Sequence, residues 1–517
     1  MNSILLGIIV LILSTIGYVA WRVFMGWKNL KFYKAQGVPT FFYPTTGMFQ
    51  FYSRSLAENK RKSTMEFIKK YTNENKSGLI AVNSIAGAES TLLAYGAEST
   101  REYVLKEDSF NKVSITPELS MVVGLFYENG EEIIHRRSLF NKLFSYHEVE
   151  TLAPKINELI KQSFAEFNKA KGIKPVGDGT EWTRVNLNEI YETVMSKIAN
   201  LIIFGSGSIE DPENAKLMNR MHDLLAIIVK AIVDTRKNPF YILSPTISKA
   251  LHLVPSVKIL KDAFKEQVEI IKVIMKNREA RPSASEDCYL DRVIQHNKQC
   301  QIEGKPTEKL SDQAIAGDFN LFVFAGTDTS QNTTKMSICH MAENPSLKQI
   351  CANVCKEIYT EKGELNMDGV ENSEYVDKWV KETLRLFNPV ARQFGRIANK
   401  DLTFRGVKVR KGDYLMLLFT GMNFEESVFP KPNEFNLERF SKENEKAIPK
   451  YQFTPFSIGK RTCLGKYLGE LMVKLLVTEF YKFYEFEKPA DVEYYQLLWI
   501  VTMETNPILN IKTKVQL

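Results

Sequence analysis

The chain has 517 residues, of which 44% are hydrophobic, so it is long enough for a large buried core and for more than one domain. Its net charge of +7 comes from 68 basic and 61 acidic residues, and so small an excess argues against a nucleic-acid-binding protein. Six cysteines in this length exclude a disulfide-rich secreted scaffold and fit a reducing compartment.

The N-terminal segment from Ile4 to Trp21 is almost continuously apolar. It is long enough to cross the hydrocarbon core of a membrane as a helix. A cleaved signal peptide is the alternative, but such peptides begin with basic residues and end at a small-residue cleavage site, whereas this chain begins Met1-Asn2-Ser3. We therefore predict an uncleaved anchor over residues 1–27.

Basic residues follow the apolar segment at Arg22, Lys28, Lys31 and Lys34. Their position places the body of the protein on the cytosolic side of the membrane. Residues 28–50 are basic and contain Pro39 and Pro44, which predicts a stiff hinge. Residues 51–517 show no internal repeat and no second boundary, so we expect one domain there.

The body is predicted to be mainly α-helical with small β-sheets. Strand-like runs at residues 78–83 and 90–95 precede a helical pattern from Ala97. From Glu150 to Lys276, apolar residues recur at intervals of three and four, which indicates successive amphipathic helices. Residues 402–418 contain a further β-pattern around a turn at residues 411–413.

Residues Ser311 to Asn344 predict one long helix, which Pro345 ends. At 1.5 Å per residue it would extend over roughly 50 Å. Its middle holds Ala325-Gly326-Thr327-Asp328-Thr329, where Gly and hydroxylated residues are poor helix formers. A carboxylate among apolar turns is costly unless it has a partner or a function. A kinked core helix with a capped Asp is the structural alternative.

The stretch from Phe456 to Gly465 holds a single cysteine, Cys463, in a basic loop before a helical run. A thiolate there would lie at a helix N-terminus, where the helix dipole and unpaired N–H groups lower a cysteine pKa and favour metal ligation. Gly459 permits a sharp turn, and Gly465 allows close approach to a flat group. Arg461 offers a planar fork that suits a carboxylate, and Phe456 would shield the sulfur.

This stretch resembles the haem-binding loop of the cytochromes P450, F-x-x-G-x-R-x-C-x-G, at every fixed position. The resemblance implies the cytochrome P450 fold, with haem b between the long central helix and the helix that follows the cysteine loop. It makes the thiolate of Cys463 the axial iron ligand, which favours O–O cleavage. Residues 325–329 match the family's A-G-x-D-T segment, so Ala325 and Gly326 are expected against the haem. Asp328 and Thr329 are expected to deliver protons to dioxygen.

Further haem contacts are implied by the same resemblance. Arg137 and Arg396 stand where the family has arginines that contact the haem propionates. Ile133 occupies the position where the family usually has a tryptophan for the same purpose, so one propionate donor is missing. His135 or Lys112 is a weak candidate to replace it.

The family's E-x-x-R pair is present as Glu382 and Arg385, and a later Arg439 completes its ion-pair network, with an architectural role. Alone, Glu and Arg at this spacing indicate a surface ion pair on a helix. The substrate-pocket walls expected from the resemblance are Phe319, Phe322, Val390 and Ala391.

The resemblance implies a haem-thiolate monooxygenase that inserts one atom of dioxygen into a lipophilic substrate. No flavin or nicotinamide motif is visible, so electrons are expected from an NADPH-dependent flavoprotein reductase, with cytochrome b5 as a further partner. Lys460 and Lys466, together with Arg136 and Lys142, are expected to form a basic docking face. The expected location is the endoplasmic reticulum membrane, single-pass, with the catalytic domain in the cytosol.

Two alternatives remain open. One is a haem-thiolate isomerase or dehydratase that acts on peroxides without a reductase. The Asp328-Thr329 pair argues against it. The other is a haem-binding protein without catalytic activity.

Overall fold

The computed structural model describes residues 2–43, 77–84, 87–112, 122, 124–176, 181–206, 211–238, 241, 253–280, 288–390, 392–393, 395–494, 496–498, 502–504 and 507–514. Helices dominate this part of the chain, as the periodicity predicts. The longer ones are α1 (Asn2–Lys34), α8 (Tyr146–Lys171), α9 (Leu187–Phe204), α11 (Pro212–Lys237), α14 (Pro255–Ala280), α15 (Tyr289–Ile302), α16 (Asp312–Glu343), α17 (Pro345–Ile358), α19 (Glu374–Leu386) and α22 (Lys466–Phe483).

Shorter helices connect these elements. They are α4 (Ala97–Leu105), η1 (Glu107–Ser109), α6 (Gly124–Tyr127), α7 (Glu131–Asn141), η2 (Pro306–Glu308), α18 (Met367–Asn372), α20 (Phe419–Asn423), η3 (Leu437–Phe440), α21 (Lys442–Ala447) and η4 (Gly459–Arg461). Two of them, α7 and η4, carry residues that the sequence places at the candidate site.

The largest sheet has six strands in the order β1-β2-β3-β9-β6-β4. These strands are β1 (Thr40–Tyr43), β2 (Leu79–Ser84), β3 (Gly87–Ala94), β4 (Phe110–Lys112), β6 (Arg396–Ala398) and β9 (Tyr414–Leu417). The sheet joins segments that are far apart in sequence, because β3 pairs in parallel with β9 and β4 pairs antiparallel with β6.

Three smaller sheets complete the β-structure. One has the order β10-β13-β5, formed by β10 (Tyr484–Glu487), β13 (Ile508–Thr513) and β5 (Thr183–Asn186). The two others are hairpins, β7 (Leu402–Phe404) with β8 (Val407–Val409) and β11 (Gln496–Leu498) with β12 (Thr502–Glu504).

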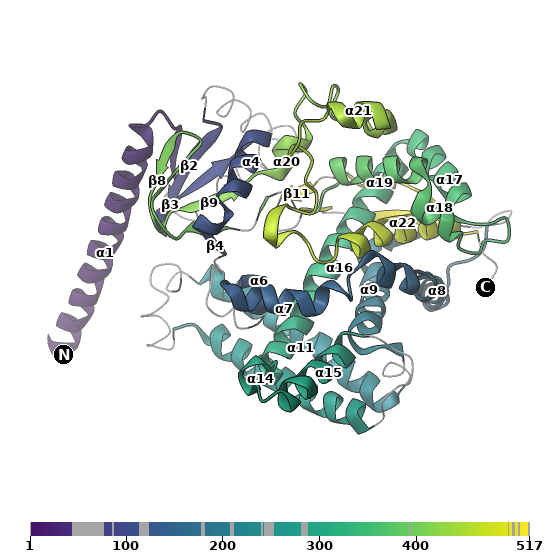
Figure 1. Cartoon of the computed structure of the whole chain (residues 1–517), viewed down its shortest axis with the longest axis horizontal. Coiled ribbons are helices and arrows are strands. Elements are labelled where there is room, and N and C mark those ends of the chain that lie inside the picture. Colours follow the sequence, from purple (N-terminus) through teal and green to yellow (C-terminus); the bar gives the residue numbers. More distant parts are fainter. Residues whose placement is uncertain are drawn as a thin grey trace.

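Helix α16 runs through the middle of the helical part of the molecule, with α9, α14 and α22 packed against it (Figure 1). Its start is fixed by Ser311, whose hydroxyl accepts a hydrogen bond from the Ala314 N–H at 3.2 Å, a standard N-cap. It ends at Glu343, two residues before Pro345, where the sequence places the stop. The predicted long central helix is therefore present.

Two large hydrophobic clusters form most of the core in the described part of the chain, beside a third, minor one of Met336, Leu386, Phe387 and Phe424. The larger one fills the space between the helices, with α8, α9, α14, α16 and α22 as major contributors. The smaller one lies between the six-stranded sheet and the end of α1, where Leu30 and Tyr33 are buried.

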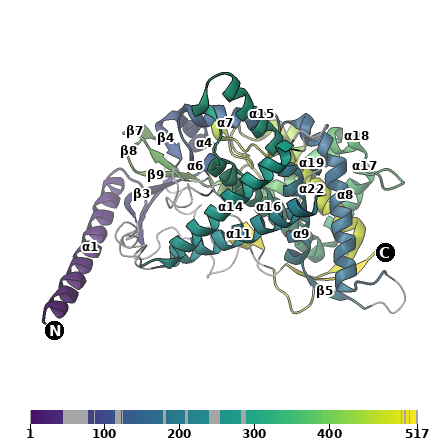
Figure 2. The ribbon, with the colours of Figure 1, turned by 90° about the horizontal axis from the view of Figure 1, so that it is seen from below.

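Helix α1 projects from the body, and its N-terminus lies at the far end, beyond the sheet (Figures 1 and 2). It remains helical to Lys34, so the first residues of the predicted hinge continue the helix. Within the described residues, no helix is both long enough and apolar enough to cross a membrane. The side chains of residues 1–12, which belong to the predicted anchor, lie outside the described part of the structure.

Candidate active site

The loop that carries Cys463 is fixed by backbone and side-chain contacts on both sides. Gly459 has a φ of +84°, and a Cβ on it would lie 2.3 Å from Oε2 of Glu107, so glycine is required there on two counts. The same Oε2 accepts a hydrogen bond from the Lys460 N–H at 2.9 Å. The N–H of Cys463 donates to the carbonyl oxygen of Phe456 at 3.0 Å, which closes the loop.

The ring of Phe456 packs on Gly469 of α22, where a Cβ would come within 3.1 Å of the ring. Helix α22 itself begins at Lys466, three residues after Cys463. The thiol therefore lies at the start of a helix, as the sequence predicts, and the aromatic ring at the head of the motif lies against that helix.

The charge state of Cys463 differs from the sequence-based expectation. Its side chain keeps an exposed surface, yet protein atoms surround most of it, and burial raises the pKa of the thiol. The N–H of Gly465 and the nearby Arg137 and Lys112 lower the pKa, but they do not outweigh the loss of hydration. The net shift is therefore opposite to the lowering expected from the helix terminus, although the Gly465 N–H acts in the expected direction, and a metal ion bound at the sulfur would favour the thiolate.

Four basic residues, Lys112, Arg137, Arg396 and Arg461, lie close to one another, and we call them the cationic group; Lys112 and Arg137 also act on Cys463. The β4–β6 pairing sets Lys112 directly opposite Arg396. Burial lowers the pKa of Lys112 well below its usual value, and Arg396, Arg461 and Arg137 lower it further. Burial, followed by Arg137 and Arg396, lowers the pKa of Arg461 to about 10. Like charges held this close favour an anionic partner.

Hydrogen bonds orient the members of the cationic group. Arg461 donates from Nη1 to the carbonyl oxygen of Glu128 at 2.8 Å and from Nη2 to that of Phe126 at 2.9 Å. Arg137 on α7 donates from Nη2 to the carbonyl oxygen of Thr462 at 2.6 Å. Arg396 donates from Nε to the hydroxyl of Tyr103 at 2.8 Å. The structure thus brings together the three arginines that the sequence assigns to one anionic group.

Ile133 stands where a tryptophan was expected as a propionate donor, and Lys112 is the candidate replacement that the structure describes. Ile133 lies on α7 and is buried in the larger core cluster, so it offers no polar contact. Lys112, which the sequence offers only weakly, lies beside Arg396, with its Nζ 3.5 Å from the centre of the Phe126 ring. The side chain of His135, the other weak candidate, lies outside the described residues.

The residues present fit a flat, dianionic group such as haem. The Nε of Arg461 is buried and has no hydrogen-bond partner, so a donor remains for a carboxylate. A Cβ built on Gly465 would meet no atom within 4 Å, and the same holds for Gly326 on α16. Both glycines therefore leave room on the faces where the sequence places the haem. A cysteine thiol and four cations are the donor set that an iron porphyrin with two propionates requires.

The distal segment stays helical through residues 325–329. Burial raises the pKa of Asp328, while Gln331 and then Lys335 lower it. Gln331 donates from Nε2 to Oδ1 of Asp328 at 3.0 Å, and its own Oε1 is buried without a partner. Thr329 donates from its hydroxyl to the carbonyl oxygen of Ala325 at 2.7 Å. Asp328 is thus held by a neighbouring amide one turn along the helix.

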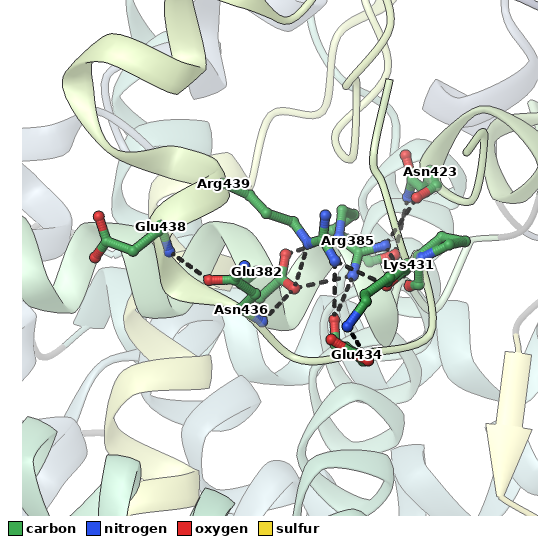
Figure 3. A network of polar contacts seen from close by, with 9 residues as sticks. Glu382, Arg385, Asn423, Lys431, Glu434, Asn436, Glu438 and Arg439 are labelled. Carbon is green, nitrogen blue, oxygen red and sulfur yellow. Dashed lines mark hydrogen bonds and ion pairs between the residues drawn. The ribbon is translucent and has the colours of Figure 1, made fainter. Parts of the chain in front are cut away.

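The Glu382, Arg385 and Arg439 network is buried, and Figure 3 shows the side chains of Arg385 and Arg439 pointing toward Glu382. Arg385 donates from Nε and Nη2 to the two carboxylate oxygens of Glu382 at 2.7 and 2.9 Å. The Nε of Arg439 lies 3.3 Å from Oε1 of Glu382. Arg385 also donates from Nη1 to the carbonyl oxygens of Asn423 and Pro432. The network therefore fastens helix α19 to the segment that leads to the cysteine loop.

Of the four expected pocket walls, Phe319 and Phe322 pack on the core side of α16, and the other two stay predictions. Phe319 has no exposed surface and packs in the core against Phe204 and His222, so it is not a pocket wall. Phe322 packs against Phe140, Phe144 and Tyr289, which also assigns it to the core side of α16. Val390 is half-buried beside the smaller core cluster. Ala391 lies outside the described residues.

Gln331 is a residue that the candidate-site prediction lacked, and Lys112 was only a weak candidate in it. Lys112 belongs to no motif, and only the strand pairing across the sheet brings it to Arg396. Gln331 lies three residues after Asp328, so helical spacing alone was a usable signal for that contact. Arg136 is a further correction, because it is buried rather than part of an exposed basic face.

The chain resembles known proteins over most of its length. The sequence profile described as "Cytochrome P450" matches residues 44–510. Cytochrome P450 3A11 of Mus musculus is 25% identical over 419 residues, which cover 78% of this chain and 79% of that protein. Cytochrome P450 3A30 of Fundulus heteroclitus is 27% identical over 64% of this chain and 71% of its own length. The match to cytochrome P450 3A41 of Mus musculus is 29% identical but spans only 44% of this chain and 46% of that protein.

A solved structure described as the heme domain of cytochrome P450DA superposes with a TM-score of 0.67. The two chains are 15% identical, and the superposition covers 92% of this chain and 98% of the other. At this level of identity the likeness concerns the fold, and it agrees with the arrangement of α16 and α22 around the cysteine loop.

Proposed function

Because the chain belongs to the cytochrome P450 family of haem-thiolate monooxygenases, we propose that it oxidises a lipophilic organic substrate with dioxygen and with electrons from a partner reductase. The observation that carries the proposal is the meeting of Cys463 with the cationic group, in a chain whose long central helix α16 carries Asp328. Haem b, once bound, supplies dioxygen activation and the transfer of one oxygen atom to the substrate.

Cys463 would ligate the iron, and Arg137, Arg396, Arg461 and Lys112 would hold the two propionates. The lowered pKa of Arg461 and the absence of a hydrogen-bond partner for its Nε support this assignment. Phe456 would limit access of water to the sulfur from the α22 side. Gly326 and Gly465 would let the backbone approach the two faces of the ring.

Asp328 and Thr329 would move protons on the distal side. Asp328 has a carboxyl group whose pKa is raised by burial, which makes it a better proton donor near neutrality than an exposed aspartate. The hydrogen bond that Gln331 donates holds Oδ1 of Asp328. Oδ2 would then interact with a water molecule or with Thr329. Thr329 can rotate away from the Ala325 carbonyl oxygen to donate its proton elsewhere.

Electrons would come from an NADPH-dependent flavoprotein reductase, with cytochrome b5 as a second donor. Lys460, Lys466 and Lys142 are exposed, and the first two flank the cysteine loop. Lys460 pairs with Asp108 at 2.7 Å, an exposed ion pair that an acidic partner could replace. Attraction between opposite charges would speed association, and added salt would weaken it.

The N-terminal segment would attach the enzyme to the endoplasmic reticulum membrane in a single pass, with residues 1–27 as the anchor and the catalytic domain in the cytosol. Support comes from the described part of α1, where large apolar side chains point into solvent: Leu13, Ile16, Trp21, Phe24 and Trp27. Tryptophans beside lysines are typical of the interface between membrane and water.

The test is the carbon-monoxide difference spectrum of the reduced protein. Intact protein should give the thiolate-type Soret band, and Cys463→Ser should lose it. If the intact protein lacks this band, the proposal is wrong. A substrate screen by spin-state shift then follows, and product formation should require NADPH, reductase and dioxygen together. Turnover of a peroxide without them would instead indicate the isomerase or dehydratase class.

A further inference from the structure

A second buried ion-pair network, separate from the Glu382 network, joins α7 and α15 to α16. Asp318 on α16 has no exposed surface. Both of its carboxylate oxygens accept hydrogen bonds from Nη2 of Arg136 on α7, at 2.7 and 2.8 Å. The hydroxyl of Tyr289, the first residue of α15, donates to Oδ2 at 2.9 Å. Three helices therefore meet on one carboxylate.

The same arginine also reaches the segment that holds the cysteine loop. Nη1 of Arg136 pairs with the carboxylate of Glu128. The backbone carbonyl oxygen of Glu128 in turn accepts a hydrogen bond from Arg461 inside the loop. A continuous path of contacts thus joins Asp318 to Arg461 through Arg136 and Glu128.

Arg136 is the immediate neighbour of Arg137, a member of the cationic group. With Asp318 and Glu128 as partners, Arg136 adds no net positive charge beside that group. Burial raises the pKa of Asp318 to about 6, although Arg136 and Tyr289 lower it, so the carboxyl is ionised above neutral pH. Without Asp318, a buried guanidinium next to Arg137 would keep only the partly exposed Glu128.

We propose that Asp318 is a positioning residue for the haem site. Through Arg136 it holds α7 and residues 126–128 where Arg137 and Arg461 can bind the haem carboxylates, and it offsets the charge of Arg136. The inference rests on the haem site proposed above. It deepens that proposal, because the cysteine motif and the E-x-x-R network do not include Asp318, Arg136 or Tyr289.

Two consequences distinguish positioning from simple structural support. The first is haem retention, because loss of Asp318 would let α7 move and weaken the grip of Arg137 and Arg461. The second is the reduction potential, because an uncompensated positive charge near the iron favours the added electron and makes the midpoint potential more positive. A general loosening of the fold has no reason to move the potential in that direction.

The chain offers a matched control in Arg278 and Asp291. Arg278 on α14 donates from Nε and Nη2 to the two oxygens of Asp291 on α15, at 2.8 and 2.7 Å. The side chains of this pair are nearly as buried as those of Arg136 and Asp318, with 5% and 17% exposed against 10% and 0%. This pair joins α14 to α15, whereas the Arg136–Asp318 pair joins α7 to α16. Asp291→Asn therefore makes the same chemical change on the helix that carries Tyr289, but at a pair that does not include α7.

The experiment uses the full-length holoprotein in mildly alkaline buffer. Haem loss is followed as transfer to excess apomyoglobin, and the midpoint potential is measured by redox titration, for the wild type, Asp318→Asn, Asp318→Glu and Asp291→Asn. Because breaking a buried pair is strongly unfavourable, Asp318→Asn should lose haem about tenfold faster or more, with a more positive potential. Asp318→Glu keeps the charge and should restore the wild-type potential, and Asp291→Asn should match the wild type in both measurements.

A double variant, Arg136→Met with Asp318→Leu, covers the case in which Asp318→Asn does not yield holoprotein. It removes both charges together, so haem loss should be fast while the potential stays near the wild-type value. Equal haem loss in Asp318→Asn, the double variant and the wild type would overturn the inference, as would an Asp291→Asn variant that loses haem as fast as Asp318→Asn. A wild type without the thiolate-type carbon-monoxide spectrum would instead refute the haem site itself.

Discussion

At the scale of single residues, the thiol of Cys463 has to lose its proton in surroundings that oppose its charge. Burial raises the pKa of the thiol, and the helix start, Arg137 and Lys112 only partly compensate. The cationic group stands under the opposite constraint, because four positive charges repel each other in a poorly hydrated space. A metal ion on the sulfur and two carboxylates among the cations would relieve both.

Lys112→Gln tests the propionate contact of a lysine that the sequence offers only as a weak candidate. The variant keeps a polar side chain, one atom shorter, but removes the charge opposite Arg396, so ferric haem should be lost about threefold to tenfold faster, equivalent to roughly 1 kcal/mol. Transfer of haem to apomyoglobin measures this rate. Lys348→Gln is the control, because Lys348 also lies over an aromatic ring, that of Phe486, but on α17. Equal rates for the two variants would remove Lys112 from the site.

Gln331→Leu tests how Asp328 is held. The amide of Gln331 stabilises the charged carboxylate, so its loss should raise the pKa of Asp328 further. The pH profile of product formed per NADPH consumed should shift to higher pH. Gln349→Leu, an exposed glutamine on α17, should leave the profile unchanged. An unchanged profile in Gln331→Leu would show that this contact does not tune proton delivery.

At the scale of elements, two buried ionic networks fix helices to the segments that carry the site. The Glu382 network ties α19 to residues 423–439, and the Asp318 network ties α7 and α15 to α16. Ion pairs of this kind are not strongly stabilising compared with apolar packing, but removing one partner leaves a buried charge without compensation. Their effect is to fix one relative position of the elements that they join.

Glu382→Gln should therefore be strongly destabilising, because Arg385 and Arg439 would both lose their carboxylate. The expected loss is about 3–5 kcal/mol in the free energy of unfolding, measured by urea titration. Glu438→Gln is the control from the neighbouring segment, since the exposed Glu438 pairs with Lys378 at 3.3 Å. It should change the stability by less than about 1 kcal/mol. Similar losses in both variants would contradict an architectural role for the buried network.

At the scale of the whole molecule, helix α1 is joined to the body by a docked C-terminal end. The hydroxyl of Tyr33 donates to Oδ2 of Asp413 at 2.6 Å, and Oδ1 of the same carboxylate accepts from the Ser90 N–H at 2.8 Å. Arg410 adds a contact to Oδ2 at 3.0 Å and another to Asn29 at 2.8 Å. The end of α1 is therefore held by the sheet, while the rest of the helix extends beyond it (Figure 2).

Tyr33→Phe should loosen this junction without changing its shape. It leaves a buried carboxylate with one donor fewer, which costs about 1–3 kcal/mol. Limited trypsin digestion should then cut more rapidly at Lys31 and Lys34, as seen by mass spectrometry of the released peptides. Tyr18→Phe, on the projecting part of α1, should leave the cleavage rate as in the wild type. Identical digestion of both variants would show that the Tyr33 hydroxyl does not hold α1.

Much of the architecture could be read from local patterns. The long helix around residues 325–329, its N-cap at Ser311 and its stop at Pro345 follow from propensity and capping chemistry, which act within a few residues. The two early strands and the helix from Ala97 were equally visible. The walls of the pocket could not be predicted in this way. Phe319 has the spacing of a helix face, but the spacing does not indicate which neighbouring element that face contacts.

The sequence by itself determined that Cys463, Arg461 and Gly459 share one loop, and that Asp328 and Thr329 lie on a long helix, since these relations are local. Only the tertiary structure decided that Lys112 faces Arg396, that Asp318 joins α7 to α16, and that the Cys463 thiol is held above its usual pKa. Those relations depend on which distant segments meet and on how much water they exclude. Strand pairing, helix packing and desolvation are properties of the assembled fold and leave no fixed spacing in the chain.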